Sequence, residues 1–177
     1  MRQLLVCCFA LALFACGSSD DDSGGGPGGG GCDSAGQSPA AFECKILELV
    51  NQERAAGATC GGKAMPPVGS LSMHPVLRQT ARAHATDMAQ NGFFSHDNLQ
   101  GKSPFDRMTE AGYDYASAGE NIAAGSPSPE AAMEQWMQSP GHCGNVMKAS
   151  FTDLGVGYAY ADASQYGHYW VQNFGSQ

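Results

Sequence analysis

Two histidines and one glutamate, each in a short motif, are the residues of this chain best suited to chemistry. They are His96, Glu120 and His142, in the stretches Phe-Phe-Ser-His, Gly-Glu-Asn-Ile-Ala and Ser-Pro-Gly-His-Cys. Imidazole and carboxylate groups coordinate divalent metals and exchange protons near neutral pH. The glycine, serine and proline residues beside them favour loops over helix interiors. The sequence therefore offers all three as catalytic candidates and the two imidazoles as candidate metal ligands.

Four helices precede or separate these motifs. Apolar spacing and serine–proline or histidine–proline starts predict them over residues 39–56, 74–92, 103–111 and 128–137. Each start has proline at a first helical position, where its missing N–H costs no intrahelical bond.

Strand patterns gather late in the chain. Residues 154–160 alternate between large and small side chains, and the aromatic segment 169–174 is β-prone, which together predict an antiparallel hairpin. A third strand over 118–124 would carry Glu120 to an edge of the sheet. Helices early and strands late indicate an α+β fold.

Each candidate also has a purely structural interpretation. His96 could cap carbonyls at a helix end, and Glu120 could fix its own turn by accepting backbone hydrogen bonds. His142 is expected in a Pro-Gly turn, where two imidazoles alone make a thin metal site and predict weak binding. His84 lies on the apolar stripe of the second helix and is interpreted as a core histidine.

From Leu71 to Gly175 the chain resembles the CAP superfamily (cysteine-rich secretory proteins, antigen 5, pathogenesis-related 1), in particular its bacterial secreted branch. The motifs Phe-Ser-His, Gly-Glu-Asn-Ile-Ala, Trp-Met-x-Ser-Pro-Gly-His and Gly-Val-Gly-Tyr occur together and in the family's order. The resemblance implies a CAP domain over residues 39–177, folded as a three-layer α-β-α sandwich with a small antiparallel sheet.

The resemblance also implies a cavity tetrad of two histidines and two acids. His96, His142 and Glu120 correspond to three of its members, and Ser139 stands where eukaryotic members carry the second acid. Glu120 and Ser139 are thus expected at the cavity. Half of the acidic pair is missing unless Glu134 or Asp97 substitutes for it. Asn51 and Arg54 match another family habit and are interpreted as structural.

Four cysteines remain once a signal segment and Cys16 are set aside, and four in an exported protein imply two disulfides. Three pairings are open on the sequence alone. No Cys-x-x-Cys spacing occurs among them, which argues against a zinc site built of cysteines. The resemblance implies the pairs Cys60–Cys143 and Cys32–Cys44.

The first residues read as targeting sequence. Residues 1–15 combine a positive start with a short apolar run and are expected to be a signal peptide of the lipoprotein type. Cys16 follows a lipobox-like Leu-Phe-Ala and is the expected lipid anchor, the alternative being an ordinary secretory signal cut near Ala15. Residues 16–38, rich in Gly, Ser and Asp, are expected to be a flexible tether. The expectation is an envelope lipoprotein, in the outer membrane if the host has one, or a secreted protein.

The net charge and the motifs limit the classes of function that this chain can have. A net charge of −8 without a Lys/Arg cluster argues against nucleic-acid binding and against electrostatic adsorption to anionic lipid. No Gly-x-Ser-x-Gly, His-Glu-x-x-His or free cysteine accompanies the tetrad. We therefore expect a monomeric binding or interaction module for a lipid, an envelope component or a protein. It requires no cofactor, although weak binding of a divalent metal such as zinc is expected. The alternative is a metal-dependent hydrolase or peptidase using His96, Glu120 and His142.

Overall fold

The computed structural model describes residues 32–177. The predicted signal peptide, Cys16 and most of the predicted tether lie outside the described residues. In chain order the elements are α1 (Pro39–Ala56), β1 (Ala58–Cys60), β2 (Lys63–Met65), β3 (Ser72–Met73), α2 (Pro75–Asn91), α3 (Pro104–Glu110), β4 (Ser117–Ala124), α4 (Pro129–Gln138), α5 (Pro140–Val146), β5 (Asp153–Tyr160) and β6 (His168–Ser176).

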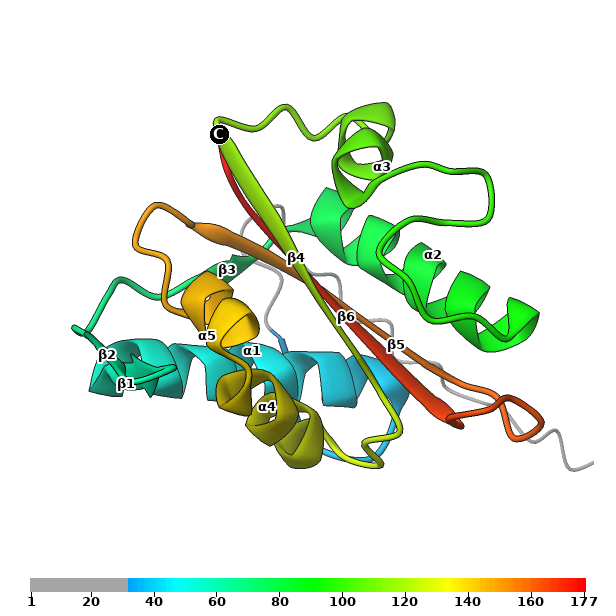
Figure 1. The fold of residues 1–177 in the computed structure, drawn as a ribbon, viewed down its shortest axis with the longest axis horizontal. Coiled ribbons are helices and arrows are strands. Elements are labelled where there is room, and N and C mark those ends of the chain that lie inside the picture. Colours follow the sequence, from blue (N-terminus) through cyan, green and yellow to red (C-terminus); the bar gives the residue numbers. More distant parts are fainter. Residues whose placement is uncertain (1–31) are drawn as a thin grey trace, which may run out of the picture.

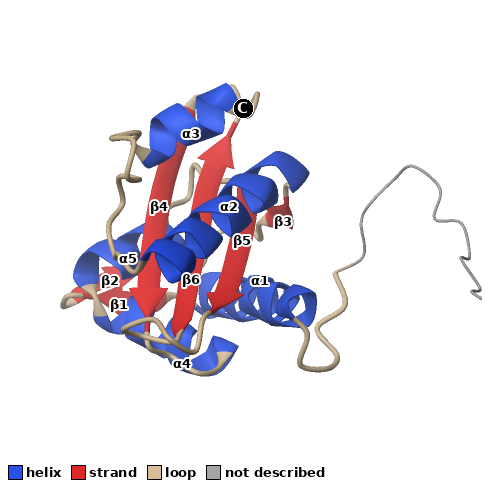
Figure 2. Cartoon of the chain, turned by 90° about the vertical axis from the view of Figure 1, so that its right-hand side faces the viewer, coloured by secondary structure: helices blue, strands red, loops and turns tan. Residues whose placement is uncertain are grey.

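A four-stranded sheet in the order β3-β5-β6-β4 forms the middle layer. β6 pairs antiparallel with both β5 and β4, whereas β3 pairs parallel with β5. α2 and α3 lie on one face of the sheet, and α1, α4 and α5 lie on the other (Figure 1; Figure 2). The predicted α+β class and three-layer α-β-α sandwich are confirmed, and β4, which carries Glu120, is an edge strand.

The four predicted helices are confirmed, and their capping groups show why the sequence signals them. Ser38 Oγ accepts a hydrogen bond from the Ala41 backbone N–H at 3.1 Å, and Ser103 and Asp106 form a reciprocal capping box. Gly92 ends α2 with φ +67°, a left-handed conformation that glycine adopts without strain. This residue turns the chain out of α2 toward His96.

The turn predicted at His142 is wrong, because this residue lies in the first turn of α5. Pro140 begins that helix, and its seven residues include two glycines, so its intrinsic helix propensity is low. Tertiary contacts hold it instead, since Cys143 is bonded to Cys60 and Val146 is fully buried. The short strands β1, β2 and β3 were also not predicted, because two or three residues carry too little pattern.

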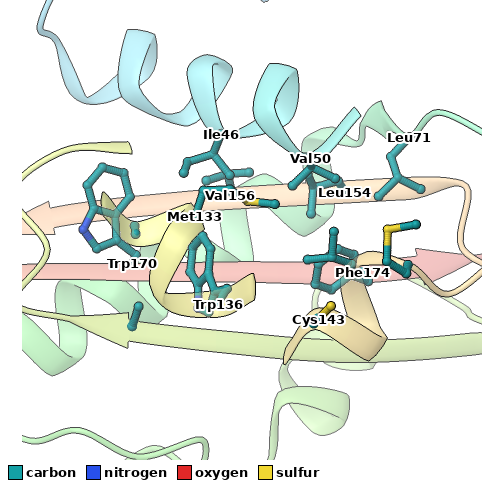
Figure 3. Close-up of a cluster of buried hydrophobic side chains, with 14 of the residues drawn as sticks. Ile46, Val50, Leu71, Met133, Trp136, Cys143, Leu154, Val156, Trp170 and Phe174 are labelled. Atoms are coloured by element: carbon teal, nitrogen blue, oxygen red, sulfur yellow. The ribbon is translucent and has the colours of Figure 1, made fainter. Parts of the chain in front are cut away.

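The larger apolar core fills the space between the sheet and the α1, α4 and α5 layer (Figure 3). Trp136 of α4 and Trp170 of β6 are both fully buried in it. A second cluster lies between α2 and the other face, around Ala81, Ala85 and Val171. The aromatic end of the chain is therefore part of the core. Among the described residues, no helix is long and apolar enough to cross a membrane.

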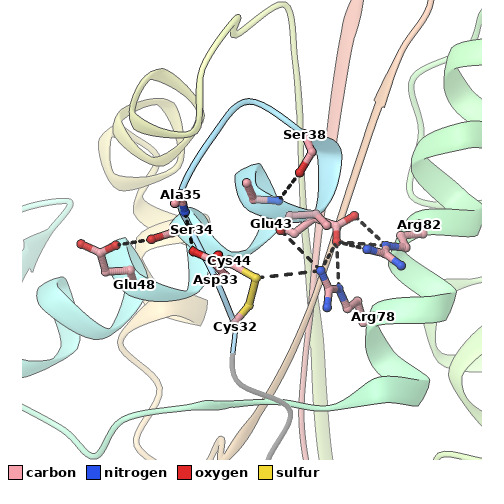
Figure 4. Close-up of a disulfide and its surroundings, with 12 residues drawn as sticks. Cys32, Asp33, Ser34, Ala35, Ser38, Glu43, Cys44, Glu48, Arg78 and Arg82 are labelled. Carbon is pink, nitrogen blue, oxygen red and sulfur yellow. Dashed lines mark hydrogen bonds and ion pairs between the residues drawn. A yellow bond between two sulfur atoms is a disulfide. The ribbon is translucent and has the colours of Figure 1, made fainter. Parts of the chain in front are cut away.

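Both predicted disulfides are present. Cys60–Cys143 joins β1 to α5, and Cys32–Cys44 joins the segment before α1 to that helix (Figure 4). Beside the second disulfide, the buried Glu43 carboxylate forms ion pairs with Arg78 and Arg82 of α2 (Figure 4). The first described residues and α1 are thus tied covalently to each other and electrostatically to α2.

Arg54 and Asn51 fix the end of α1, as predicted. The Arg54 guanidinium is fully buried and donates to the backbone carbonyls of four residues, Gly69, Val146, Lys148 and Phe151. Asn51 exchanges two hydrogen bonds with the backbone of Leu71. Loops distant in sequence are therefore held to one helix end.

Candidate functional site

The Glu120 carboxylate is the centre of a buried polar network on the α2 side of the sheet. Its side chain is 1% exposed, and one oxygen lies 2.8 Å from Nδ1 of His96. The other oxygen accepts from Nη2 of Arg107 at 2.7 Å and, with the Asn173 amide oriented to suit its neighbours, from the Asn173 nitrogen at 3.0 Å. The Asn173 oxygen then accepts from Thr80 of α2. Both carboxylate oxygens of Glu120 are therefore engaged within the protein.

Asn121 performs the corresponding task on the opposite face, because neighbouring strand residues point to opposite sides of a sheet. It is fully buried, donates to the His142 carbonyl at 3.1 Å and accepts from Asn145 of α5 at 2.9 Å. In the β4–β6 register, Glu120 is opposite Asn173 and Asn121 is opposite Gln172. The Glu-Asn pair in β4 therefore holds both helical layers to the sheet edge.

His96 lies in the segment that follows α2, with its side chain 49% exposed. An ionised carboxylate only accepts hydrogen bonds, so Nδ1 of His96 carries the hydrogen and Nε2 is left for other partners. Two further bonds hold the segment: Arg107 donates to the His96 carbonyl at 2.7 Å, and His84 Nε2 lies 2.8 Å from the Ser95 carbonyl oxygen. His84 is 1% exposed, as expected for a core histidine. Its contact with the Ser95 carbonyl helps to fix the segment that carries His96.

His142 is presented by α5, which the Cys60–Cys143 disulfide and Asn121 hold in place. Burial lowers the pKa of its imidazole below the usual value, and the charge of His96 lowers it further. The neutral imidazole is therefore favoured near neutral pH, which suits a hydrogen-bonding group or a metal ligand.

Two adjoining hollows share His96 and Asp97 and form the candidate site, which we call the His96 groove. The first, of about 420 Å³, is lined by Phe94, Ile122 and His142 in addition to the shared residues. The second, of about 410 Å³, lies between the start of α3 and Asn145 of α5, with Glu120 at its wall. Both are within the size range of small-molecule sites. His96, Glu120 and His142, the three residues singled out in the sequence, thus all line the groove.

Of the acids and hydroxyls considered for the missing tetrad position, only Asp97 lies at the groove. Ser139 is the residue between α4 and α5, and it lines neither hollow. Glu134 is exposed on α4 and also lines neither hollow. The expected cavity position of Ser139 is therefore not found in these two hollows.

Sequence reasoning missed Arg107 and Asn173, which hold Glu120. Arg107 looks like one more charge on a short amphipathic helix, and nothing in its neighbours points 13 residues ahead to Glu120. A signal did exist for Asn173, because polar residues in the middle of a buried aromatic strand require partners. The antiparallel pairing of β4 with β6 supplies that partner directly.

The residues present fit a metal only weakly. Nε2 of His96 and the neutral His142 imidazole are suitable ligands, and the bond from Nδ1 of His96 to Glu120 is the usual support behind a metal-binding histidine. Within residues 32–177, however, no three His, Cys, Asp or Glu side chains are grouped so that they could hold a metal ion. Remaining coordination positions would have to come from water or a bound molecule.

Low pH should lower the stability of the fold because two histidines, His84 and His142, become protonated on unfolding. Burial lowers the pKa of His84 and of His142 below 6.5, so the folded chain takes up these protons less readily than the unfolded chain. Their stability contribution is therefore complete above about pH 6.5 and is lost as the pH falls below that value. Urea unfolding near neutral pH and at about pH 5.5 should show a loss for the native chain that shrinks in His84→Gln and in His142→Gln. An equal pH dependence in all three proteins would contradict this assignment.

Comparisons with known proteins find relatives in sequence and in fold. The sequence model described as "CAP: Cysteine-rich secretory protein family" matches residues 47–174. Two Bacillus subtilis (strain 168) proteins are each 38% identical: the uncharacterized protein YkwD over 141 residues, and the uncharacterized membrane protein YlbC over 132 residues. These alignments cover 80% and 75% of this chain, but only 49% of YkwD and 34% of YlbC, so the chain spans half or less of these relatives.

Among solved structures, an extracellular protein of Bacillus anthracis that contains an SCP domain is similar in fold. It superposes with a TM-score of 0.64 at 28% identity, over 80% of this chain and 45% of that one.

Proposed function

This chain belongs to the cysteine-rich secretory protein (CAP) family, and we propose that it is a binding module that recognises a component of the cell envelope through the His96 groove. The observation that carries this proposal is the state of Glu120. Both of its oxygens are engaged by His96, Arg107 and Asn173, and its side chain is 1% exposed. A carboxylate that is buried and holds three hydrogen bonds in this way positions the His96 ring and is poorly suited to activate water.

On this proposal the chain acts outside the cytoplasm. Residues 1–15 would direct export, acylated Cys16 would anchor the chain, and the part of the predicted tether before the Cys32–Cys44 disulfide would let the domain reach its ligand. Two disulfides support an oxidising compartment. The ligand is an envelope lipid, polymer or protein, and not a nucleic acid, because the chain carries a net charge of −8.

A metal-dependent hydrolase is the second candidate, and it is favoured by one observation: His96 and His142 line the same hollow. A bound Zn²⁺ would be held by His96 Nε2 and the His142 imidazole, and it would supply Lewis acidity and a water of lowered pKa. Catalytic zinc sites use three protein ligands, however, and this groove offers two. A weakly bound metal is therefore compatible with the binding module and is not required by it.

The test separates binding from turnover. The purified Cys16→Ser variant of the full-length chain, which cannot be acylated, is mixed, with its disulfides formed, with murein sacculi, or with vesicles of phosphatidylethanolamine and phosphatidylglycerol, and sedimented with and without EDTA. We expect it to sediment with at least one of these materials, equally with and without EDTA. In parallel, it should not hydrolyse fluorescent casein with or without Zn²⁺.

Two outcomes would reject the binding module. One is casein hydrolysis that needs Zn²⁺ and is abolished in the double variant His96→Ala, His142→Ala, together with calorimetric Zn²⁺ binding lost in the same variant. The other is the absence of sedimentation with every envelope material.

A further inference from the structure

Exposed aromatic side chains are concentrated beside the His96 groove. In residues 32–177, six large hydrophobic side chains are well exposed, and four of them form two aromatic pairs, Phe94 with Tyr166 and Phe105 with Tyr115. The ring centroids of these pairs are 5.8 Å and 6.2 Å apart. Exposed apolar surface that gathers in one place marks a binding site more often than single exposed residues do.

Each pair contributes one ring to a different hollow of the groove. Phe94 lines the hollow that contains His142, and Phe105 lines the hollow that contains Asn145. Both phenylalanines are 42% exposed. Since the hollows share His96 and Asp97, the groove has an aromatic platform in each of its two parts and polar groups between them.

The polar groups between the platforms are of mixed type. They comprise the Ser95 and Ser103 hydroxyls, the His96 imidazole, the Asp97 carboxylate and the Asn145 amide. Ser95, Ser103 and Asn145 already form hydrogen bonds within the protein. An acyl chain would still cover Nε2 of His96 and the Asp97 carboxylate without offering them hydrogen bonds, which costs free energy. A ligand for this groove must therefore present flat apolar faces and, between them, hydrogen-bonding groups.

Linked sugar rings meet both requirements. The axial C–H groups of a pyranose make an apolar face that stacks on the negative face of an aromatic ring, and its hydroxyls and acetamido groups form hydrogen bonds around the rim. Phenylalanine is suited to this task because its few rotatable bonds cost little entropy when it is fixed.

Charge and the sheet edge restrict the ligand further. No lysine or arginine lines either hollow, Asp97 lines both, and the chain carries a net charge of −8, so a polyanion is disfavoured. An extended peptide would be expected to bind by pairing with the backbone of the edge strand β4. Side chains of this protein already contact that strand, since Asn145 Nδ2 lies 3.4 Å from the Glu120 carbonyl and Lys148 Nζ donates to Ser117 Oγ. A peptide is therefore disfavoured as well.

We propose that the His96 groove binds an uncharged polysaccharide of N-acetylated amino sugars, with one sugar ring stacked on Phe94 and a later ring of the same chain on Phe105. This assignment rests on the proposed function and names the class of its ligand.

The test is calorimetric titration of the full-length oxidised chain carrying Cys16→Ser, which has no acyl anchor, with a hexamer of N-acetylglucosamine. Phe94→Ala and Phe105→Ala should each weaken binding about tenfold, the loss expected for one stacking contact. Tyr160→Ala is the matched control, because Tyr160 is an exposed aromatic residue at the end of β5 that lines neither hollow. It should bind the hexamer as the native chain does. An anionic hyaluronan oligosaccharide should bind more weakly than the hexamer.

Failure of the hexamer to bind, or equal binding by the native chain and both phenylalanine variants, would overturn the assignment. Tighter binding of an unfolded peptide or of phospholipid vesicles would also overturn it. In that case sedimentation with vesicles would still support an envelope-binding module. Zinc-dependent casein hydrolysis would reject the module itself, so the two failures can be told apart.

Discussion

Replacing Arg107 with methionine should lower the free energy of unfolding by about 3–5 kcal/mol, the usual cost of removing one partner of a buried ion pair. The Glu120 side chain is 1% exposed and that of Arg107 is 10% exposed, so water cannot take over the lost interaction. The same substitution removes the bonds from Arg107 to the His96 and Lys102 carbonyls. Urea unfolding monitored by circular dichroism measures the change.

A matched control comes from the ion pair between Lys102 and Glu110. Its side chains are 45% and 54% exposed, so Lys102→Met should cost less than about 1 kcal/mol. The double variant Arg107→Met, Glu120→Gln should regain part of the loss, because no charge is then left buried without a partner. An Arg107→Met protein as stable as the Lys102→Met protein would show that the buried pair contributes little.

The position of Arg107 also marks a limit of sequence reasoning at this site. His96, Glu120 and His142 could be named from motifs, because their types and flanking residues are unusual in the sequence. Arg107 and Asn173 could not, because their importance depends on which strand pairs with which and in what register. Only the alignment of β4 with β6, which places Glu120 opposite Asn173, shows that these two buried polar residues are partners.

The fold was predictable to the extent that local signals determine it. Helix starts follow from Ser38, Ser103 and Ser128, whose side chains cap the backbone as the sequence indicates. α5 could not be predicted, since a seven-residue segment with two glycines becomes helical only through the Cys60–Cys143 bond and the surrounding core. Prediction of the third layer likewise depended on the family resemblance, because periodicity alone does not say on which face of a sheet a helix packs.

Helix α2 lies so close to β5 that two glycines of the strand have no room for a side chain, and this contact gives the second large prediction. A Cβ at Gly157 would lie 2.2 Å from the Ala81 carbonyl carbon, and one at Gly155 would lie 2.0 Å from that of Leu77. The obstructing atoms are helix backbone, which cannot rotate away as a side chain can. Gly157→Ala should therefore lower the free energy of unfolding by about 3 kcal/mol or more, at the upper end of overpacking effects.

Gly144 provides the control for this glycine substitution, because a Cβ there would meet nothing within 4 Å and the residue lies inside α5. Gly144→Ala should be neutral or stabilising by up to about 1 kcal/mol, since alanine is the better helix former. The effect of Gly157→Ala should also reach the groove. A displaced α2 moves Thr80, which bonds Asn173 behind Glu120, and His84, which holds the Ser95 carbonyl beside His96. If Gly157→Ala unfolds at the same urea concentration as Gly144→Ala, α2 is not held against β5 in the way described.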